Sequence, residues 1–296
     1  MTVYSQISQN KGKTFFIFFL FIILFSGFFY LIGQYFHSGN SYIILGLFLS
    51  IISSVGSYFY SDKIVLFTSG ARPASKKEFF DFYTTTENLA LAAGLPMPKL
   101  YVIDDVSPNA FATGRDPKHA VVCATTGLLQ KLDRSDIEGV ISHELSHVKN
   151  HDILISSVVA VLVGTLAIAS DWIMRSLWWG RSDDNDNRNR SPIFAIFFIV
   201  ALIITPIVAT LIQLAISRRR EFLADASGVL ITRNPDGLVS ALEKISSYPP
   251  LRRASPSTAH LFIANPLGKK SRSSWFVNLF STHPPIEERI KILRSM

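Results

Sequence analysis

The sequence predicts an α-helical membrane protein that carries an α+β domain with a small β-sheet. Of its 296 residues, 48% are hydrophobic and only 17% are charged, which is too apolar for an ordinary soluble domain of this size. The mean hydropathy of +0.29 agrees with this. Four apolar runs, at residues 15–33, 41–60, 153–174 and 192–216, have about the 20 residues that a helix needs to cross a bilayer. We therefore expect about four transmembrane helices.

The first two apolar runs predict an N-terminal transmembrane hairpin, residues 1–60. Lys11 and Lys13 precede the first run, as they would in a cleaved signal peptide. The apolar core of a signal peptide, however, has only about 7 to 15 residues, so this longer run predicts a retained span. A short polar turn, "HSGNS", separates it from the second run.

The third and fourth runs predict a second transmembrane hairpin, residues 153–216. A buried helix can be equally apolar, and these runs contain Asp171 and Pro206, so a hairpin that does not span the membrane is the alternative. The sequence between the two runs, "RSDDNDNRNR", is polar and carries both signs of charge, which predicts a solvated loop.

The distribution of basic residues predicts that both termini lie in the cytoplasm. Lysines precede the first span, lysines and an arginine follow the second, and Arg218, Arg219 and Arg220 directly follow the fourth. The arginines between the third and fourth runs favour the opposite orientation but are fewer. Because two spans return the chain to the side that it left, residues just before and just after the second hairpin can meet.

The two polar segments, residues 61–152 and 217–296, are predicted to form one domain, because either alone would bury only a thin core. In the first segment a helix is predicted to end at Gly94, with Pro96 preventing its continuation. The stretches "KLYVID" and "HAVVCAT" predict strands, with "NAFAT" as a short edge strand between them.

A capping box and a lone cysteine complete the local predictions. Ser135 and Glu138 have the spacing of a capping box that opens the next helix. Cys123 is the single cysteine, which excludes an intrachain disulfide framework and a multi-cysteine metal cluster. Its neighbours in "AVVCAT" predict a buried strand residue.

The helix that follows carries the pattern H-E-x-x-H, formed by His143, Glu144 and His147. Residues four apart share one helical face, about 6 Å apart along the axis, so the two imidazoles can converge on a single ion. Glu144 projects beside that ion, where it can accept a proton from water. A buried apolar stripe on the opposite side leaves the motif facing a cleft; it consists of Ile137, Ile141, Leu145 and Val148. The alternative is a solvated face with two surface histidines.

A catalytic zinc usually has three protein ligands. His151 continues the spacing of the two histidines, but it lies about 12 Å from His143 along a straight helix, too far for one ion. Glu221 is the remaining candidate. Asp225 shares its helical face and could accept a hydrogen bond from a histidine N–H group. Alternatively, Glu221 only pairs with the arginines that precede it.

Several motifs together resemble the M48 family of membrane-bound metallopeptidases, in its bacterial heat-shock branch. The resemblance covers nearly the whole chain. Besides the two N-terminal spans, it rests on "PNAFATG", "HELSHVKNHD", "SRRREFLADASG", "AHLFIANP" and "HPPIEERI", at residues 108–114, 143–152, 217–228, 259–266 and 283–290. The combination is far more specific than the H-E-x-x-H pattern alone.

The resemblance implies a gluzincin-type zinc metallopeptidase domain with one Zn²⁺ per chain. It implies His143, His147 and Glu221 as the metal ligands and Glu144 as the general base. It also implies a multi-pass protein of the bacterial inner membrane, with its active site facing the cytoplasm, that degrades misfolded or damaged membrane proteins under stress. A segment like residues 109–113 would hold an extended peptide in such a protein, or Asn109 merely caps a turn. His283 would stabilise an oxyanion or be structural.

Other functions stay open on the residues alone. One is a dedicated CaaX-type or signal-type membrane peptidase with a single substrate. Another is a non-enzymatic membrane scaffold or a transporter, although the predicted spans carry few of the ionisable residues that transport pathways use. The net charge of +7 favours anionic lipid over nucleic acid as a partner, because no basic stretch is interleaved with stacking aromatic residues.

Overall fold

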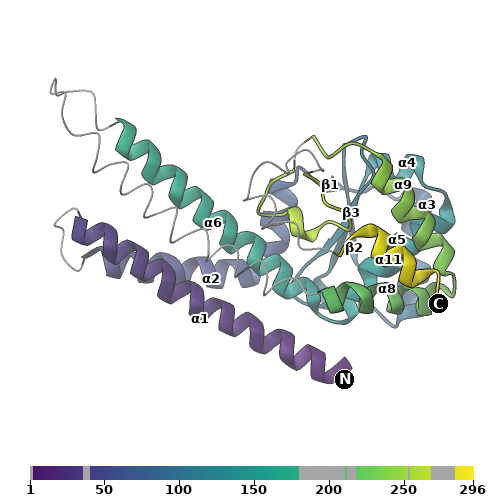
Figure 1. Ribbon diagram of the computed structural model, residues 1–296, viewed down its shortest axis with the longest axis horizontal. Coiled ribbons are helices and arrows are strands. Elements are labelled where there is room, and N and C mark those ends of the chain that lie inside the picture. The colour runs from purple at the N-terminus through teal and green to yellow at the C-terminus, as the bar shows by residue number, and fades with distance from the viewer. Residues whose placement is uncertain (1–2, 36–40, 180–210, 212–217, 253, 268–283) are drawn as a thin grey trace.

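The computed structural model describes residues 3–35, 41–179, 211, 218–252, 254–267 and 284–296. Figure 1 shows three long helices that extend away from a unit containing the sheet and the shorter helices. The long helices are α1 (Val3–Tyr35), α2 (Ser41–Thr68) and α6 (Asp152–Trp179). The N-terminus lies at the end of α1 that is nearer to the sheet-containing unit (Figure 1).

Three segments of these helices are long and apolar enough to cross a membrane: Ser8–Leu31, Ser41–Thr68 and Asp152–Asp171. They coincide with the first three predicted spans and are helical throughout. Large apolar side chains on their surfaces are exposed, such as Phe15 at 69% and Phe48 at 60%, as expected of helices that face lipid. The fourth predicted run, residues 192–216, and the polar loop before it lie outside the described residues, apart from residue 211.

The long helices pack closely because small residues line their contacts. On α2, Gly46, Ser50, Ser54 and Ser57 are buried along one side. A Cβ atom at Gly46 would lie 2.6 Å from the Cβ atom of Phe29 on α1, so only glycine permits this approach. Small residues at helix contacts are typical of membrane proteins, where backbone proximity strengthens van der Waals packing.

The sheet has four strands in the order β1-β2-β4-β3. Strands β2 and β4 pair in parallel, and the other pairs are antiparallel. All residues of β4 are buried, because one face of the sheet covers the helical core and the other contacts α2 and α6. The predicted edge strand and the burial of Cys123 are therefore confirmed. The strands are β1 (Arg72–Pro73), β2 (Lys99–Ile103), β3 (Ala110–Thr113) and β4 (Val121–Thr125).

Helix α5 (Arg134–Lys149) is the centre of the helical layer. It packs against helices that precede α6 in the sequence and against helices that follow it. Gly139 permits a close contact: a Cβ atom there would lie 2.6 Å from the backbone nitrogen of Leu238 on α9. The other helices of this unit are α3 (Phe80–Ala93), α4 (Thr126–Lys131), α8 (Arg218–Thr232), α9 (Pro235–Ser247) and α11 (Ile286–Leu293), with 3-10 turns η1 (Pro117–His119) and η2 (Ala259–Leu261).

The ends of two helices test the local predictions. Gly94 ends α3 in the left-handed conformation, with φ of 70°, as expected. The predicted capping box of Ser135 and Glu138 is wrong. Asp133 is the N-cap of α5, and its carboxylate accepts from the backbone nitrogen of Asp136, whose carboxylate accepts from the backbone nitrogen of Asp133.

Candidate metal centre

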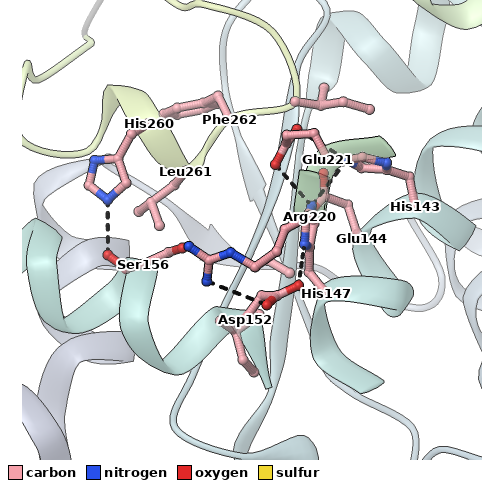
Figure 2. A pocket seen from close by; sticks show the side chains of 13 residues that line it. His143, Glu144, His147, Asp152, Ser156, Arg220, Glu221, His260, Leu261 and Phe262 are labelled. Atoms are coloured by element: carbon pink, nitrogen blue, oxygen red, sulfur yellow. Dashed lines mark hydrogen bonds and ion pairs between the residues drawn. The ribbon is translucent and has the colours of Figure 1, made fainter. Parts of the chain in front are cut away.

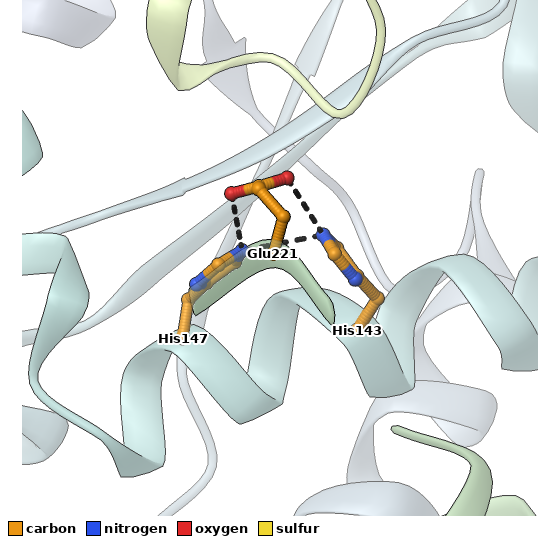
Figure 3. A group of neighbouring side chains, drawn as sticks. All are labelled: His143, His147 and Glu221. Carbon is orange, nitrogen blue, oxygen red and sulfur yellow. Dashed lines mark hydrogen bonds and ion pairs between the residues drawn. The ribbon is translucent and has the colours of Figure 1, made fainter. Parts of the chain in front are cut away.

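The two histidines of the H-E-x-x-H pattern lie side by side on the buried part of α5. Their Nε2 atoms are 3.2 Å apart, and the rings are perpendicular. Figure 3 shows Glu221 reaching toward both rings from α8. The structure thus brings together residues 143, 147 and 221, which the sequence predicts as ligands, from helices separated by the whole of α6.

The geometry of this group fits a small metal ion. The Glu221 carboxylate has Oε1 3.5 Å from Nε2 of His147 and Oε2 4.0 Å from Nε2 of His143. Around a tetrahedral zinc with bonds of about 2.0 to 2.2 Å, neighbouring ligand atoms lie about 3.3 to 3.6 Å apart. One ligand atom from each of the three side chains lies within 4.8 Å of the other two, so small side-chain adjustments suffice for one ion.

Each histidine has an acidic partner on its second ring nitrogen. Nδ1 of His143 lies 2.9 Å from Oδ1 of Asp225, and Nδ1 of His147 lies 3.1 Å from Oδ2 of Asp152. A carboxylate in this position fixes the ring orientation and directs the Nε2 lone pair at the ion. The predicted outer partner, Asp225, therefore contacts His143. Asp152 was not predicted.

Burial and neighbouring charges move the pKa values of the two imidazoles in opposite directions. Burial, with the nearby charge of Arg289, lowers the pKa of His143 to about 4. Burial also lowers the pKa of His147, but the hydrogen bond to Asp152 and the charge of Glu221 outweigh it and raise that pKa to about 9. In the metal-free protein His143 is thus a ready ligand, whereas His147 must lose a proton before it can bind an ion.

Glu144 lines a pocket beside the three candidate ligands (Figure 2). Its carboxyl is buried, and loss of hydration raises its pKa to about 7, although a hydrogen bond from the backbone of Ala112 opposes this. A group that titrates near neutral pH suits proton transfer in both directions. The pocket is also lined by residues 260–263 and by Ile153 and Ser156 of α6.

Three other residues singled out in the sequence have different outcomes. Asn109 joins its own segment to the one around residue 264, since its Nδ2 donates to the backbone oxygen of Ala264 and its Oδ1 accepts from the backbone nitrogen of Ala264. His151 lies in the turn between α5 and α6 and does not belong to the ligand group found among the described residues. His283 lies outside the described residues.

Sequence reasoning missed Arg289, a fully buried guanidinium that holds Asp225. The signal that could have found it is a charge on an apolar helix face: Arg289 shares the inward side of α11 with Ile286 and Leu293. A buried guanidinium needs a countercharge, and the Asp225 carboxylate supplies it. The guanidinium holds the pKa of Asp225 at about 2, against the effect of burial.

Comparison with known proteins agrees with this geometry. A family model described as peptidase family M48 matches residues 77–296. The chain belongs to peptidase family M48. A protein named Protease HtpX homolog from Thermoanaerobacter pseudethanolicus is 46% identical to it over 100% of this chain and 98% of that protein. One of the same name from Caldanaerobacter subterraneus is 47% identical over the same shares of the two chains.

The M48 chain is therefore an HtpX-like membrane metalloprotease. Its membrane helices and its His/His/Glu group are the two features that such an enzyme requires. A crystal structure of Ste24p from S. mikatae is also similar, with a TM-score of 0.48 and 20% identity; it covers 90% of this M48 chain, which spans 61% of that protein.

Proposed function

We propose that this M48 protein is a zinc-dependent endopeptidase with one Zn²⁺ per chain, held by His143, His147 and Glu221, and with Glu144 as its general base. The observation that carries this proposal is the convergence of the three ligand atoms within 4.8 Å of one another, beside the buried Glu144 carboxyl. Two imidazoles and one carboxylate with an open fourth position are a typical donor set for catalytic zinc.

The residues around the ion divide the work of peptide hydrolysis. A zinc ion held here supplies Lewis-acid chemistry, which polarises a peptide carbonyl and makes water more acidic. Glu144 takes a proton from the water whose oxygen bonds to the carbonyl carbon, and it delivers that proton to the amine as the C–N bond breaks. Asp225 and Asp152 keep the two imidazoles in the tautomer that leaves Nε2 available.

The membrane setting supports unfolded or damaged membrane proteins as the substrates, and hence a role in stress response. Asp152, Ile153 and Ser156 line the pocket and also form the first turns of a candidate span. The pocket thus lies where α6 leaves the sheet-containing unit. Anchoring raises the local concentration of the site toward clients in the same bilayer.

For the topology, we propose a multi-pass protein of the bacterial inner membrane whose active site faces the cytoplasm. Lys11 and Lys13 near the start of α1, together with Arg218, Arg219 and Arg220 at the start of α8, support this orientation through the positive-inside rule. We further propose two membrane hairpins, residues 1–60 and 153–216, and a catalytic domain assembled from residues 61–152 and 217–296.

The experiment compares the full-length protein in detergent with its Glu144→Gln variant. We expect about one zinc per chain in both proteins, measured by elemental analysis, because Glu144 is not a ligand. We expect digestion of casein and of an unfolded membrane protein by the parent only, with a loss of at least about 100-fold in the variant. Glu138→Gln, on the exposed side of the same helix, is the control and should cleave normally.

Loss of zinc from Glu144→Gln, or retained cleavage, would contradict the proposed roles. Mapping the cleaved bonds then tests the substrate class. Cuts spread over many unfolded membrane proteins support quality control, whereas cuts at one C-terminal or signal sequence would instead identify a dedicated CaaX-type or signal-type peptidase.

A further inference from the structure

A buried hydrogen-bond network connects the first membrane helix to the proposed metal centre. Asn10 lies near the start of the candidate span in α1 and is only 4% exposed. Its side-chain amide nitrogen donates to the backbone oxygen of Asn150 at 3.0 Å and to Oδ1 of Asp152 at 2.9 Å. Both partners are about 140 residues further along the chain.

The second oxygen of Asp152 completes the connection. Oδ2 lies 3.1 Å from Nδ1 of His147, so one carboxylate joins Asn10 on α1 to a candidate ligand on α5. Arg220 also approaches this carboxylate, with Nη1 3.5 Å from Oδ1. Figure 2 shows the side chain of Asp152 lying between those of Arg220 and His147. Asn10 therefore contributes, together with Arg220, to holding the Asp152 carboxylate in place beside His147.

The side-chain amide of Asn10 also bonds to both ends of a strained turn. Helix α5 ends at Lys149 and α6 begins at Asp152, so the chain changes direction within two residues. His151 takes a positive φ of 57°, which is unfavourable for a residue with a side chain and persists only where the surroundings enforce it. Asn10 bonds to the residue before His151 and to the residue after it, and it thereby holds both ends of the turn.

A buried amide in an apolar helix is costly unless its hydrogen bonds are made, so its presence needs a reason. We propose that Asn10 is a positioning residue for His147, acting through Asp152, and that the first membrane helix is therefore a working part of the metal centre as well as an anchor. The inference rests on the proposed ligand set.

The test measures metal binding rather than cleavage. Full-length protein carrying Glu144→Gln, in detergent, is loaded with Co²⁺ as a probe, and the affinity is measured by competition with a chelator. We expect Asn10→Ala to weaken Co²⁺ binding by roughly 10-fold, the lower end of the range for outer partners of metal ligands. We also expect its visible absorption bands to shift, because His147 is no longer held in one orientation.

Thr14→Val is the matched control. Thr14 lies one turn further along α1 and is also buried, and among the described residues its hydroxyl bonds to the backbone oxygen of Asn10 in its own helix. We expect its Co²⁺ affinity and spectrum to equal those of the parent. Asn10→Ser is measured in parallel, because serine is small and polar but too short to reach Asp152, and it should behave as Asn10→Ala does.

A double-variant comparison separates positioning from helix packing. In an Asp152→Asn background, Asn10→Ala should cause little further loss of affinity, because the group through which Asn10 acts is already altered. Equal losses in both backgrounds, or an unchanged Co²⁺ spectrum in Asn10→Ala and Asn10→Ser, would overturn the inference. Absence of Co²⁺ binding by the parent would instead contradict the proposed function.

Discussion

Arg289 donates two hydrogen bonds to Asp225, at 2.9 Å to Oδ2 and 2.6 Å to Oδ1, although the two residues are 64 positions apart. The same Oδ1 atom lies 2.9 Å from Nδ1 of His143. A third bond runs from Nη1 of Arg289 to the backbone oxygen of Ile263, in the pocket wall. One buried guanidinium thus holds both the outer partner of a candidate ligand and a backbone segment that lines the same pocket.

We expect Arg289→Leu to destabilise the fold by about 3 to 5 kcal/mol, because it leaves the buried Asp225 carboxylate without its countercharge. Thermal unfolding in detergent, with and without added metal, measures this loss. Arg294→Leu is the control: Arg294 directly follows the last residue of the same helix and forms an exposed ion pair with Glu243, which is worth less than about 1 kcal/mol. Similar losses of stability for the two variants would show that the buried Arg289 contributes no more to the fold than an exposed arginine does.

Glu221→Gln should remove the ion while the fold is kept, because the amide fills the same space but lacks the negative charge. We expect a loss of metal affinity greater than the roughly 10- to 100-fold that the removal of an outer partner costs. Elemental analysis after dialysis against a weak chelator measures it. A variant that keeps a full equivalent of metal would exclude Glu221 as a ligand.

Metal binding should release a proton from His147. Its pKa of about 9 in the metal-free protein means that the imidazole is charged at pH 8, and a ligand must be neutral. We expect about one proton released per ion at pH 8, and fewer as the pH rises above 9. Calorimetry in buffers of different ionisation enthalpy counts these protons. Using Glu144→Gln removes the second group that titrates nearby, and a count near zero would refute the charged state of His147.

Gly139→Ala should destabilise the domain by about 1 to 3 kcal/mol, because the added methyl group would meet the backbone of Leu238 and force α5 and α9 apart. Chemical denaturation of the detergent-solubilised protein measures the change. Gly56→Ala on α2 is matched to it, since a Cβ atom there meets nothing within 4 Å. That control should be neutral or slightly stabilising, in line with the higher helix propensity of alanine.

The wrong prediction of the capping box shows what a local pattern leaves undecided. Ser135 with Glu138 and Asp133 with Asp136 both place a capping side chain three residues before an acidic one. The structure uses the earlier pair, and the hydroxyl of Ser135 accepts instead from the side chain of Asn234, in the turn before α9. The two patterns are equivalent within the short stretch, and the contact that Ser135 makes instead is with a residue 99 positions away, which no short stretch of sequence contains.

The sequence by itself determined the features whose cause is local. Apolar length produced the membrane helices, glycine at position 94 ended α3, and four-residue spacing put His143 and His147 on one helical face. The sequence also named Glu221 and Asp225 as candidates, but only the tertiary structure brings these two residues to the histidines. Only the tertiary structure, too, shows that Asp152 and Arg289 take part in the centre, because they belong to helices whose packing the sequence does not reveal. Helical periodicity determines which side chains share a face within one helix. Which helices come into contact depends on packing between residues far apart in the chain.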